Sequence, residues 1–179
     1  MVAKGEVERR STQVELGFTV PEASYGPNYV QFRRDWRPEE IYGFMFTVLP
    51  GLQVSPSSAT PGSKVTIKGT GFPGEDVAAL SLDGKALDLE PETSTLGSFT
   101  TEFTVPTTIA GRHAFKATAE DMYGKEATAS LEVVPSISLR PVLPDIGAEA
   151  TITGCGFAAT SPVTVEYDDQ AVAAQSSDR

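Results

Sequence analysis

Hydrophobic and polar positions alternate with a period of two along the middle of the chain. Val65 and Ile67, and then Leu80 and Leu82, stand two apart with polar or small residues between them, which is the pattern of a strand with one buried face. No window of residues 50–134 has the period of an amphipathic helix. The alternation predicts short strands near 52–55, 64–69, 77–83, 85–89, 98–105, 112–119 and 127–134.

Turn-forming residues stand between these predicted strands. Asp83-Gly84 and Tyr123-Gly124 interrupt the alternation, and glycine and aspartate favour tight reversals of the chain. The 16 Gly and 13 Pro also fit many short strands better than long helices. The predicted fold class is therefore all-β, with two antiparallel sheets packed as a sandwich.

The chain repeats itself at a constant spacing in residue number, 103 − 18 = 85, which we call the repeat offset. The tetrapeptide FTVP at 18–21 recurs at 103–106, and the heptapeptide TIKGTGF at 66–72 returns as TITGCGF at 151–157. Two motifs in one ungapped frame predict tandem structural units. Single residues keep the same frame, which pairs Gly26 with Gly111, Val48 with Val133, Pro50 with Pro135, Pro56 with Pro141, Gly62 with Gly147 and Asp83 with Asp168.

The frame of the repeat divides the chain into three predicted domains. Residues 50–134 form one complete unit, residues 1–49 correspond to the second half of a unit, and residues 135–179 correspond to the first half. A reduced β domain is an alternative interpretation of residues 1–49.

The order of these motifs resembles the Ig-like tandem repeats of bacterial and archaeal surface proteins, in the style of IPT/TIG domains. The resemblance covers residues 12–179, and the motifs that carry it are VTIKGTGF at 65–72, LDG at 82–84, GSF at 97–99, FTVP at 103–106 and GRH at 111–113. It implies tandem Ig-like β-sandwiches outside the cell, at the cell surface, which serve as a stalk, spacer or adhesive module. A fold of this kind does not by itself identify a ligand.

Composition and charge exclude several classes of partner. With 14 Lys+Arg against 24 Asp+Glu, the net charge is -10, which opposes binding to nucleic acid and to anionic lipid. No apolar run reaches the roughly 18 residues of a membrane span, and no apolar stretch of a signal peptide follows the N-terminal charges. We therefore expect a soluble chain with no nucleic-acid partner and no insertion into a membrane.

The single cysteine and single histidine argue against an enzyme. Cys155 has Thr70 as its counterpart in the repeat, and His113 has Asn28, so we expect a small buried residue and a surface or sheet-edge histidine. One Cys and one His in different repeat halves cannot supply a nucleophile, a base and an orienting group. We expect no catalytic residue, no metal site and no cofactor.

Two motifs suggest binding chemistry but fit a structural role better. Residues 69–74 spell Gly-x-Gly-x-x-Gly, the dinucleotide fingerprint, but a strand pattern follows instead of the required helix. We interpret the glycines as a bulge or tight corner that turns a phenylalanine into the core. Asp83, Asp168 and Asp169 could bind calcium, but no Asp-x-Asp-x-Asp run is present, so a turn role is favoured. The residues predicted as structural are Phe18, Phe103, Gly69, Gly71, Phe72, Gly154, Gly156 and Phe157.

One cluster departs from the repeat pattern. Residues 1–49 hold six of the 14 basic residues, the only tryptophan and three tyrosines. Trp36 among arginines in a hairpin loop could stack on a sugar or meet an acidic partner, and the alternative is a Trp that covers its own sandwich end. The candidate contact residues are Trp36, Arg33, Arg34, Arg37 and Tyr42.

These observations predict a non-enzymatic, extracellular structural or adhesive segment. Its partners would be neighbouring Ig-like repeats, other copies of itself, or a surface glycan or protein. The alternative is a carbohydrate- or protein-binding Ig-like module appended to a larger surface protein or enzyme.

The two half-units suggest a further hypothesis, in which copies complete each other head to tail. A chain cut in mid-repeat is the alternative. The apolar residues of the first half are Phe18, Val20, Val30, Phe32, Phe44, Phe46 and Val48, and those of the second are Ile137, Leu139, Ile152, Val163, Val165 and Tyr167.

Overall fold

The computed structural model describes residues 15, 17–34, 37–107, 110–142, 144–158 and 160–176, without the side chains of 32–41 and 172–176. These residues form strands and one short 3-10 helix, η1 (Glu120–Met122). The predicted all-β fold class is confirmed. In chain order the strands are β1 (Gly26–Arg34), β2 (Arg37–Val48), β3 (Gly51–Ser55), β4 (Ser58–Ala59), β5 (Lys64–Thr70), β6 (Ala79–Leu82), β7 (Lys85–Ala86), β8 (Phe99–Thr104), β9 (Gly111–Thr118), β10 (Ala127–Val133), β11 (Ser136–Arg140), β12 (Thr151–Cys155), β13 (Pro162–Tyr167) and β14 (Gln170–Ser176).

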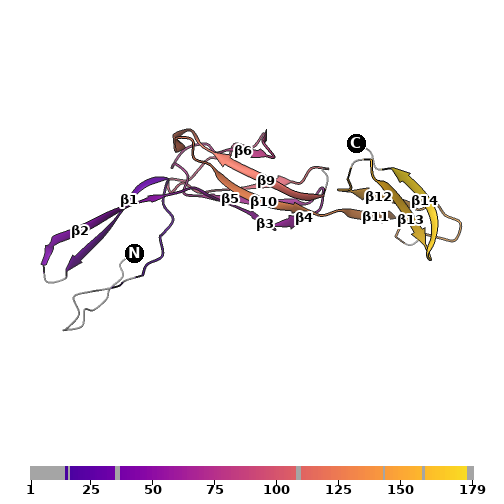
Figure 1. Ribbon diagram of the computed structural model, residues 1–179, viewed down its shortest axis with the longest axis horizontal. Coiled ribbons are helices and arrows are strands. Elements are labelled where there is room, and N and C mark those ends of the chain that lie inside the picture. Colours follow the sequence, from indigo (N-terminus) through magenta and orange to yellow (C-terminus); the bar gives the residue numbers. More distant parts are fainter. Residues whose placement is uncertain are drawn as a thin grey trace.

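The strands from β3 to β10 form a two-sheet sandwich in the middle of the molecule (Figure 1). One sheet has the order β3-β5-β8, and the other has the order β4-β10-β9-β6-β7. The pairing of β4 with β10 is parallel, and the other ladders of the sandwich are antiparallel. The predicted sandwich of two sheets is thus confirmed, and the repeated crossing of the chain between the sheets gives it an Ig-like topology.

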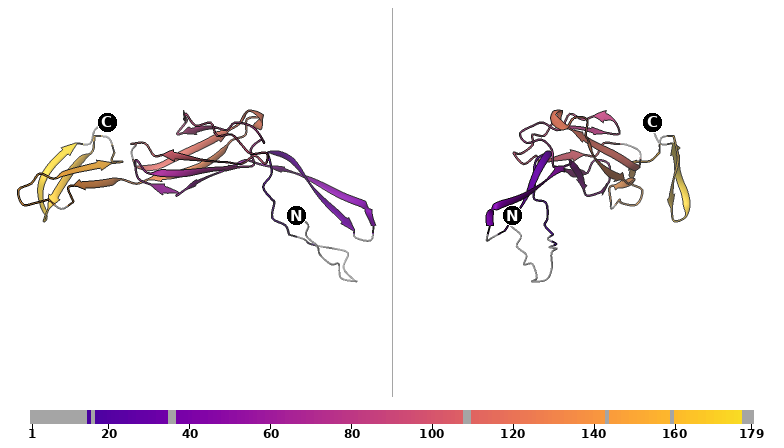
Figure 2. Two further views of the ribbon diagram at one scale, coloured as in Figure 1. Left: turned by 180° about the vertical axis from the view of Figure 1, so that it is seen from behind. Right: turned by 60° about the vertical axis from the view of Figure 1, so that its left-hand side comes forward.

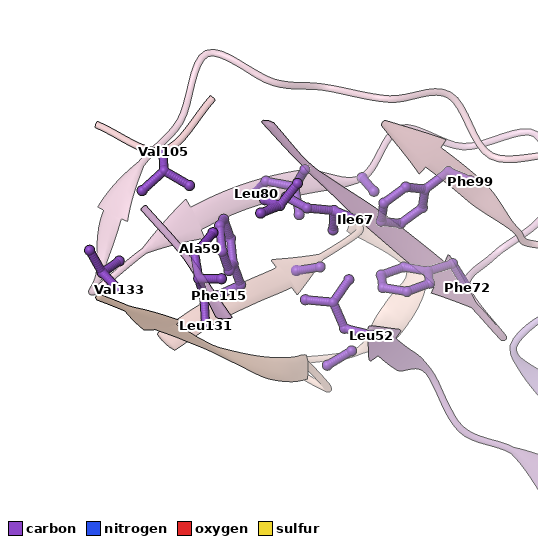
Figure 3. Close-up of a cluster of buried hydrophobic side chains, with 14 of the residues drawn as sticks. Leu52, Ala59, Ile67, Phe72, Leu80, Phe99, Val105, Phe115, Leu131 and Val133 are labelled. Atoms are coloured by element: carbon purple, nitrogen blue, oxygen red, sulfur yellow. The ribbon is translucent and has the colours of Figure 1, made fainter. Parts of the chain in front are cut away.

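The core lies between the two sheets (Figure 3). Ile67, Phe72 and Phe115 are fully buried there. The rings of Phe72 and Phe99 meet edge to face with their centroids 5.2 Å apart, an arrangement that aromatic rings favour. Along β9 and β10 nearly every second residue is buried, as the alternation in the sequence predicts.

The strands β6 and β7 and the loop that follows them are less regular than predicted. Strands were expected over 77–83 and 85–89, but β6 has four residues and β7 has two. Beyond β7 a side chain fixes the loop: the Thr93 hydroxyl donates to the Pro73 carbonyl at 2.7 Å and accepts from the Asp76 N–H at 2.9 Å. Pro91 cannot donate to a sheet ladder, so the Thr93 side chain and a few backbone bonds, such as the one from the Ala78 N–H to the Pro91 carbonyl, hold this segment in place of a regular strand.

Two side chains lie elsewhere than predicted. Phe103 was expected in the core, but it is only partly buried and packs edge to face on Phe115, with ring centroids 5.2 Å apart. The reason is that β8 is an edge strand, which leaves one side of its residues open. His113 was expected at the surface or a sheet edge, but it is buried because β9 is the middle strand of its sheet.

The two ends of the chain form separate two-stranded sheets, which are β1-β2, β11-β12 and β13-β14. The hairpin β1–β2 projects from one end of the sandwich, and the C-terminal strands lie at the opposite end (Figures 1 and 2). The molecule is therefore elongated, and each described sheet takes its strands from only one of the segments 1–49, 50–134 and 135–179.

The ladders of the ends have the same registers as ladders of the sandwich, shifted by the repeat offset. The pair Val30↔Phe44 of β1–β2 corresponds to Phe115↔Ala129 of β9–β10. In the same way β11–β12 repeats the register of β3–β5, and the turn end of β13–β14 repeats that of β6–β7. The N-terminal sheet thus matches the late strands of the sandwich, and the C-terminal sheets match its early strands.

Candidate functional site

The hairpin β1–β2 has one strongly apolar face. Directly opposed residues of an antiparallel pair share a face, so Val30 and Phe44 lie on one face and the next pair, Tyr29 and Met45, lies on the other. We call the first of these the hairpin face. Its residues with described side chains are Asn28, Val30, Tyr42, Phe44, Phe46 and Val48.

The hairpin face is open where the corresponding face of the sandwich is covered. Phe44 is 72% exposed and Tyr42 is 50% exposed. On β9 and β10, Phe115 and Leu131 are 0% and 1% exposed, whereas their counterparts Val30 and Phe46 in the hairpin are only partly buried. A two-stranded sheet has no second sheet to pack on, which explains why its apolar side chains remain in contact with water.

Each of the two C-terminal sheets has an apolar face that is at least partly open, and we call the two together the early-strand face. Ile137 is 74% exposed, although its counterpart Leu52 lies in the core of the sandwich. Ile152 is likewise exposed, whereas its counterpart Ile67 is fully buried. The residues of this face are Ile137, Leu139, Ile152, Val163, Val165 and Tyr167.

The sandwich joins each end of the chain through a similar contact. At the first junction the Tyr25 N–H donates to the Phe72 carbonyl at 2.8 Å, and at the second the Ala110 N–H donates to the Gly156 carbonyl at 2.7 Å. Tyr25 and Ala110 are counterparts in the repeat frame, and each donates to the corner that follows β5 or β12. The acceptors differ by one position in the repeat frame, since Phe72 corresponds to Phe157, so the two junctions use equivalent segments with bonds shifted by one residue.

A glycine at each corner lets the neighbouring segment approach closely. Gly71 and Gly156 have φ of +70° and +82°, a conformation that L side chains rarely adopt. A Cβ on Gly71 would lie 2.5 Å from the Leu49 carbonyl oxygen, and one on Gly156 would lie 3.1 Å from the Pro135 Cα. These two predicted structural glycines thus lie at the contacts between successive parts of the chain.

The other predicted structural glycines make room for aromatic rings. A Cβ on Gly69 would lie 2.1 Å from the ring of Phe99, and a Cβ on Gly154 would lie 2.7 Å from the ring of Phe157. After the corner, Phe72 is fully buried and Phe157 is partly buried. The corner therefore directs a phenylalanine inward in the sandwich, and less completely in the C-terminal half.

Phe18 shows the same contrast in the segment before β1. It is 48% exposed, whereas its counterpart Phe103 packs on the core. No strand is assigned at Phe18 among the described residues 17–25, although residues 99–104 form β8.

The predicted contact cluster lies at and near the tip of the hairpin. The backbones of Arg33 and Arg34 end β1, and Arg37 begins β2. Trp36 lies outside the described residues, as do the side chains of the three arginines. Tyr42 is on the hairpin face, half exposed.

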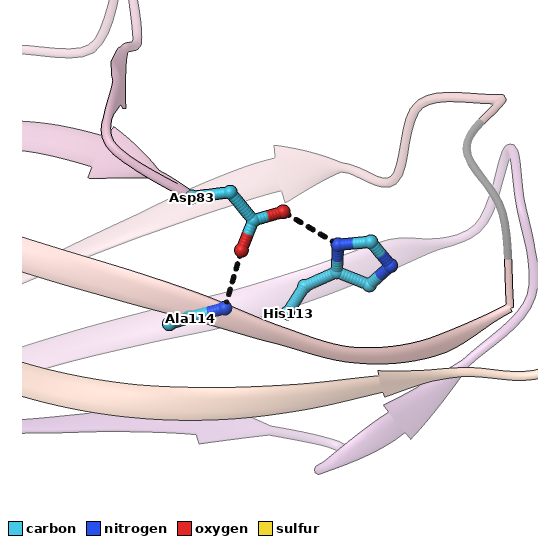
Figure 4. A network of polar contacts seen from close by, with 3 residues as sticks. All are labelled: Asp83, His113 and Ala114. Carbon is cyan, nitrogen blue, oxygen red and sulfur yellow. Dashed lines mark hydrogen bonds and ion pairs between the residues drawn. The ribbon is translucent and has the colours of Figure 1, made fainter.

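A polar contact holds β9 to the turn after β6 (Figure 4). Asp83 has a φ of +49° and accepts two hydrogen bonds, one from the Ala114 N–H at 2.8 Å and one from the His113 Nδ1–H at 2.6 Å. The bond from Ala114, followed by the contact with His113, lowers the pKa of the Asp83 carboxyl below its ordinary value. His113 and Asp83 therefore fasten two neighbouring strands of the sandwich.

The candidate ligand and nucleophile side chains of the described residues lie apart from one another. No three His, Cys, Asp or Glu side chains in this part of the chain could hold a metal ion. His113 is on β9, and the partly buried Cys155 ends β12 in a different sheet. No helix in the part of the chain that the structure describes is long and apolar enough to cross a membrane.

No family model and no curated protein matches this chain. Among solved structures it is similar to the CARDB domain of a Pyrococcus furiosus protein. The solution structure of that domain shares 18% identity, with a TM-score of 0.30, and the match covers 48% of this chain and 96% of the domain. A crystal structure of the domain in complex with di-metal ions shares 12% identity, with a TM-score of 0.34, and covers 68% and 100% respectively. At these identities and TM-scores no property of that domain is transferred to this chain.

Proposed function

We propose that this chain is a non-enzymatic structural segment of an array of Ig-like units, which keeps the parts attached to it at a fixed distance outside the cell. The observation that carries the proposal is the pair of equivalent junctions. Leu49-Pro50 and Val134-Pro135 lead from one part to the next without a linker. The extracellular location follows the resemblance to IPT/TIG-style surface repeats.

The junctions favour a stiff connection between units. Each has a backbone hydrogen bond from the segment before β1 or β9 to the corner after β5 or β12. Each also has a glycine whose missing side chain permits direct backbone contact with the connecting segment. A joint fixed at two points on neighbouring elements restricts pivoting more than a flexible linker does. Such joints suit a spacer, whose function depends on its length.

Spin labels can test the stiffness of the second junction. Gln53 on β3 and Glu166 on β13 are exposed on opposite sides of this junction, and Cys155→Ser removes the native thiol. We expect a narrow distribution of distances between labels at these two sites. The control has a Gly-Ser linker inserted between Val134 and Pro135, which should broaden the distribution. An equally broad distribution without the linker would contradict the spacer proposal.

The location can be tested separately on intact cells of the source organism. An antibody against residues 50–134 should label them without permeabilisation. Labelling that requires permeabilisation would contradict the extracellular part of the proposal.

A second candidate function is binding of a surface glycan or protein through the tip of the hairpin. The observation that favours it is the direction of the strands β1 and β2, which project away from the sandwich (Figure 1). The sequence has Trp36 between Arg34, the last residue of β1, and Arg37, the first of β2, and aromatic and arginine side chains are frequent at binding hot spots. Glycan-array binding that Trp36→Ala abolishes would support this function. Equal binding by the variant would count against it.

A further inference from the structure

The two open apolar faces are the halves of one sandwich core. The hairpin face corresponds to the inward faces of β9 and β10, and the early-strand face corresponds to those of β3, β5 and β6. In the sandwich these two sets of side chains pack on each other. Each half of the chain thus has the strands that the other half lacks.

We propose that the hairpin face of one copy of this chain binds the early-strand face of a second copy. The two halves then form a composite sandwich with the topology of the central one. This assembly goes beyond the spacer role, since it would determine how spacers connect into longer filaments.

The central sandwich shows how the strands would pair. There β6 pairs with β9 through Leu80↔Ala117 and Leu82↔Phe115. The same pairing, shifted by the repeat offset, joins Val165 of β13 to Phe32 of β1, and Tyr167 to Val30. Among the described residues, β1 pairs with β2 alone and β13 pairs with β14 alone. Both have an open edge, and an open edge is a template for adding a strand from another chain.

The side chains of the two faces suit a shared core. The opposed pair Phe115 and Ala129 of the sandwich becomes Val30 and Phe44 in the hairpin, so the large residue changes strand while the pair stays apolar. On the other side, Val165 replaces the buried Leu80. The pair gains the volume difference between Ala and Val, and the change from Leu to Val removes one methylene, so the two changes partly offset each other, and protein cores tolerate apolar changes that keep the total volume similar.

The polar contact of the sandwich also has its counterparts. Asp168 has a φ of +48°, close to the +49° of Asp83, and it is exposed. In the composite sandwich its carboxylate would accept from the Tyr29 N–H, as Asp83 accepts from Ala114. Asn28 stands where His113 stands, and its side-chain amide can donate to the same carboxylate. The contact therefore keeps a donor and an acceptor.

A second copy is the occupant that the geometry favours. The hairpin and the C-terminal strands lie at opposite ends of the sandwich (Figures 1 and 2). The direct connections at Pro50 and Pro135 leave no free segment that would let them meet within one chain. Between copies, the contact joins unlike surfaces and leaves one of each free, so it propagates head to tail.

Sedimentation velocity of the full 179-residue chain tests the proposal, with two matched variants. Phe44→Asp places a charge on the hairpin face, and Met45→Asp places the same charge on the opposite face of the same strand. Both side chains are largely exposed, at 72% and 64%, so neither change should unfold the free chain. We expect the wild-type chain and Met45→Asp to form larger species between about 1 and about 100 μM. Phe44→Asp should raise the dissociation constant by roughly 100-fold.

A circular permutant provides a second test that uses nearly the same residues. It begins at Pro50, runs to Arg179 and continues with residues 10–49. In the repeat frame, residue 179 corresponds to residue 94 and residue 10 corresponds to residue 95, so the join continues the frame. Both units would then be complete in one chain, and we expect a folded monomer at every concentration.

Several outcomes would overturn the proposal. One is a wild-type chain that stays monomeric over the whole range, and another is association that Phe44→Asp and Met45→Asp weaken equally. A third is a permutant in which residues 135–179 and 10–49 show no dispersed amide signals. The spin-label distances across the second junction lie within one copy, so a failure of the spacer proposal remains distinguishable from a failure of the assembly.

Discussion

The hairpins β1–β2 and β9–β10 have the same register and opposite environments. Val30 and Phe44 face each other as Phe115 and Ala129 do. Yet Phe115 is completely buried, whereas Val30 at the equivalent position is only partly buried and its partner Phe44 is 72% exposed. The difference comes from the neighbours: β9 lies between β10 and β6 and faces a second sheet, whereas β1 pairs with β2 alone among the described strands. Pattern and register alone therefore do not bury an apolar face.

The largest expected difference between the two hairpins concerns folding itself. Residues 50–134, expressed alone, should unfold in one cooperative transition, because they contain both sheets and the core. Residues 15–49 alone should show no transition, since an isolated two-stranded sheet is marginal in water. Calorimetry and amide dispersion check both results. A cooperative transition of the hairpin alone would contradict this explanation.

Equivalent core positions should respond differently to truncation. Phe115→Ala should lower the free energy of unfolding of the sandwich by about 3 to 5 kcal/mol, because the side chain is fully buried. Val30→Ala, at the equivalent position of the hairpin, should cost less than about 1 kcal/mol in the monomer. Urea denaturation of the 179-residue chain at low concentration measures both. Equal losses would show that the hairpin face is covered within one chain.

Phe72, which follows β5, and Phe103, on β8, offer a similar comparison. Phe72→Ala should cost about 3 to 5 kcal/mol, and Phe103→Ala should cost less because its ring is only partly buried. A loss below about 1 kcal/mol at Phe72 would contradict its place in the core.

The junction that carries the hairpin should be sensitive to a single methyl group. Gly71→Ala places a Cβ 2.5 Å from the Leu49 carbonyl oxygen at a φ of +70°, and we expect a loss of about 2 to 3 kcal/mol. Gly84→Ala is the control, because Gly84 has a similar φ of +80° with nothing within 4 Å. It should cost about 1 kcal/mol. Equal melting temperatures of the two variants would show that the contact with Leu49 contributes nothing.

The smallest expected effect is the pH dependence of stability that comes from the contact between Asp83 and His113. The hairpin has Asn28 at the position of His113. The folded-state pKa of Asp83 lies below its ordinary value of 3.8. Its contribution to stability is therefore complete above that value and is lost as the pH falls through the folded pKa. Asp83→Asn should lower the melting temperature slightly at neutral pH, and the difference from wild type should shrink below about pH 4.

A histidine variant separates the two causes of the lowered pKa. His113→Asn leaves the bond from the Ala114 N–H in place, so part of the acid dependence should remain. A constant difference between wild type and Asp83→Asn down to about pH 2 would contradict a role for the carboxylate.

The sequence by itself determined most of the strands, most of their turns and the correspondence of positions one repeat apart. These features depend on local chemistry: alternation makes one face of a strand apolar, and a glycine permits a corner wherever its φ is positive. For this reason the corner at Gly71 and the burial of Phe72 were predictable from one motif and its copy.

The tertiary structure alone decided which of the matching residues are buried. The alternation did not predict that Phe103 lies on an edge strand, that His113 lies on a middle strand, or that β4 pairs in parallel with β10. It also could not distinguish Val30 from the core residue Phe115, since the two have the same spacing and equivalent positions in their ladders. The physical reason is that burial depends on what lies above a face and beside an edge, and those neighbours come from parts of the chain distant in sequence.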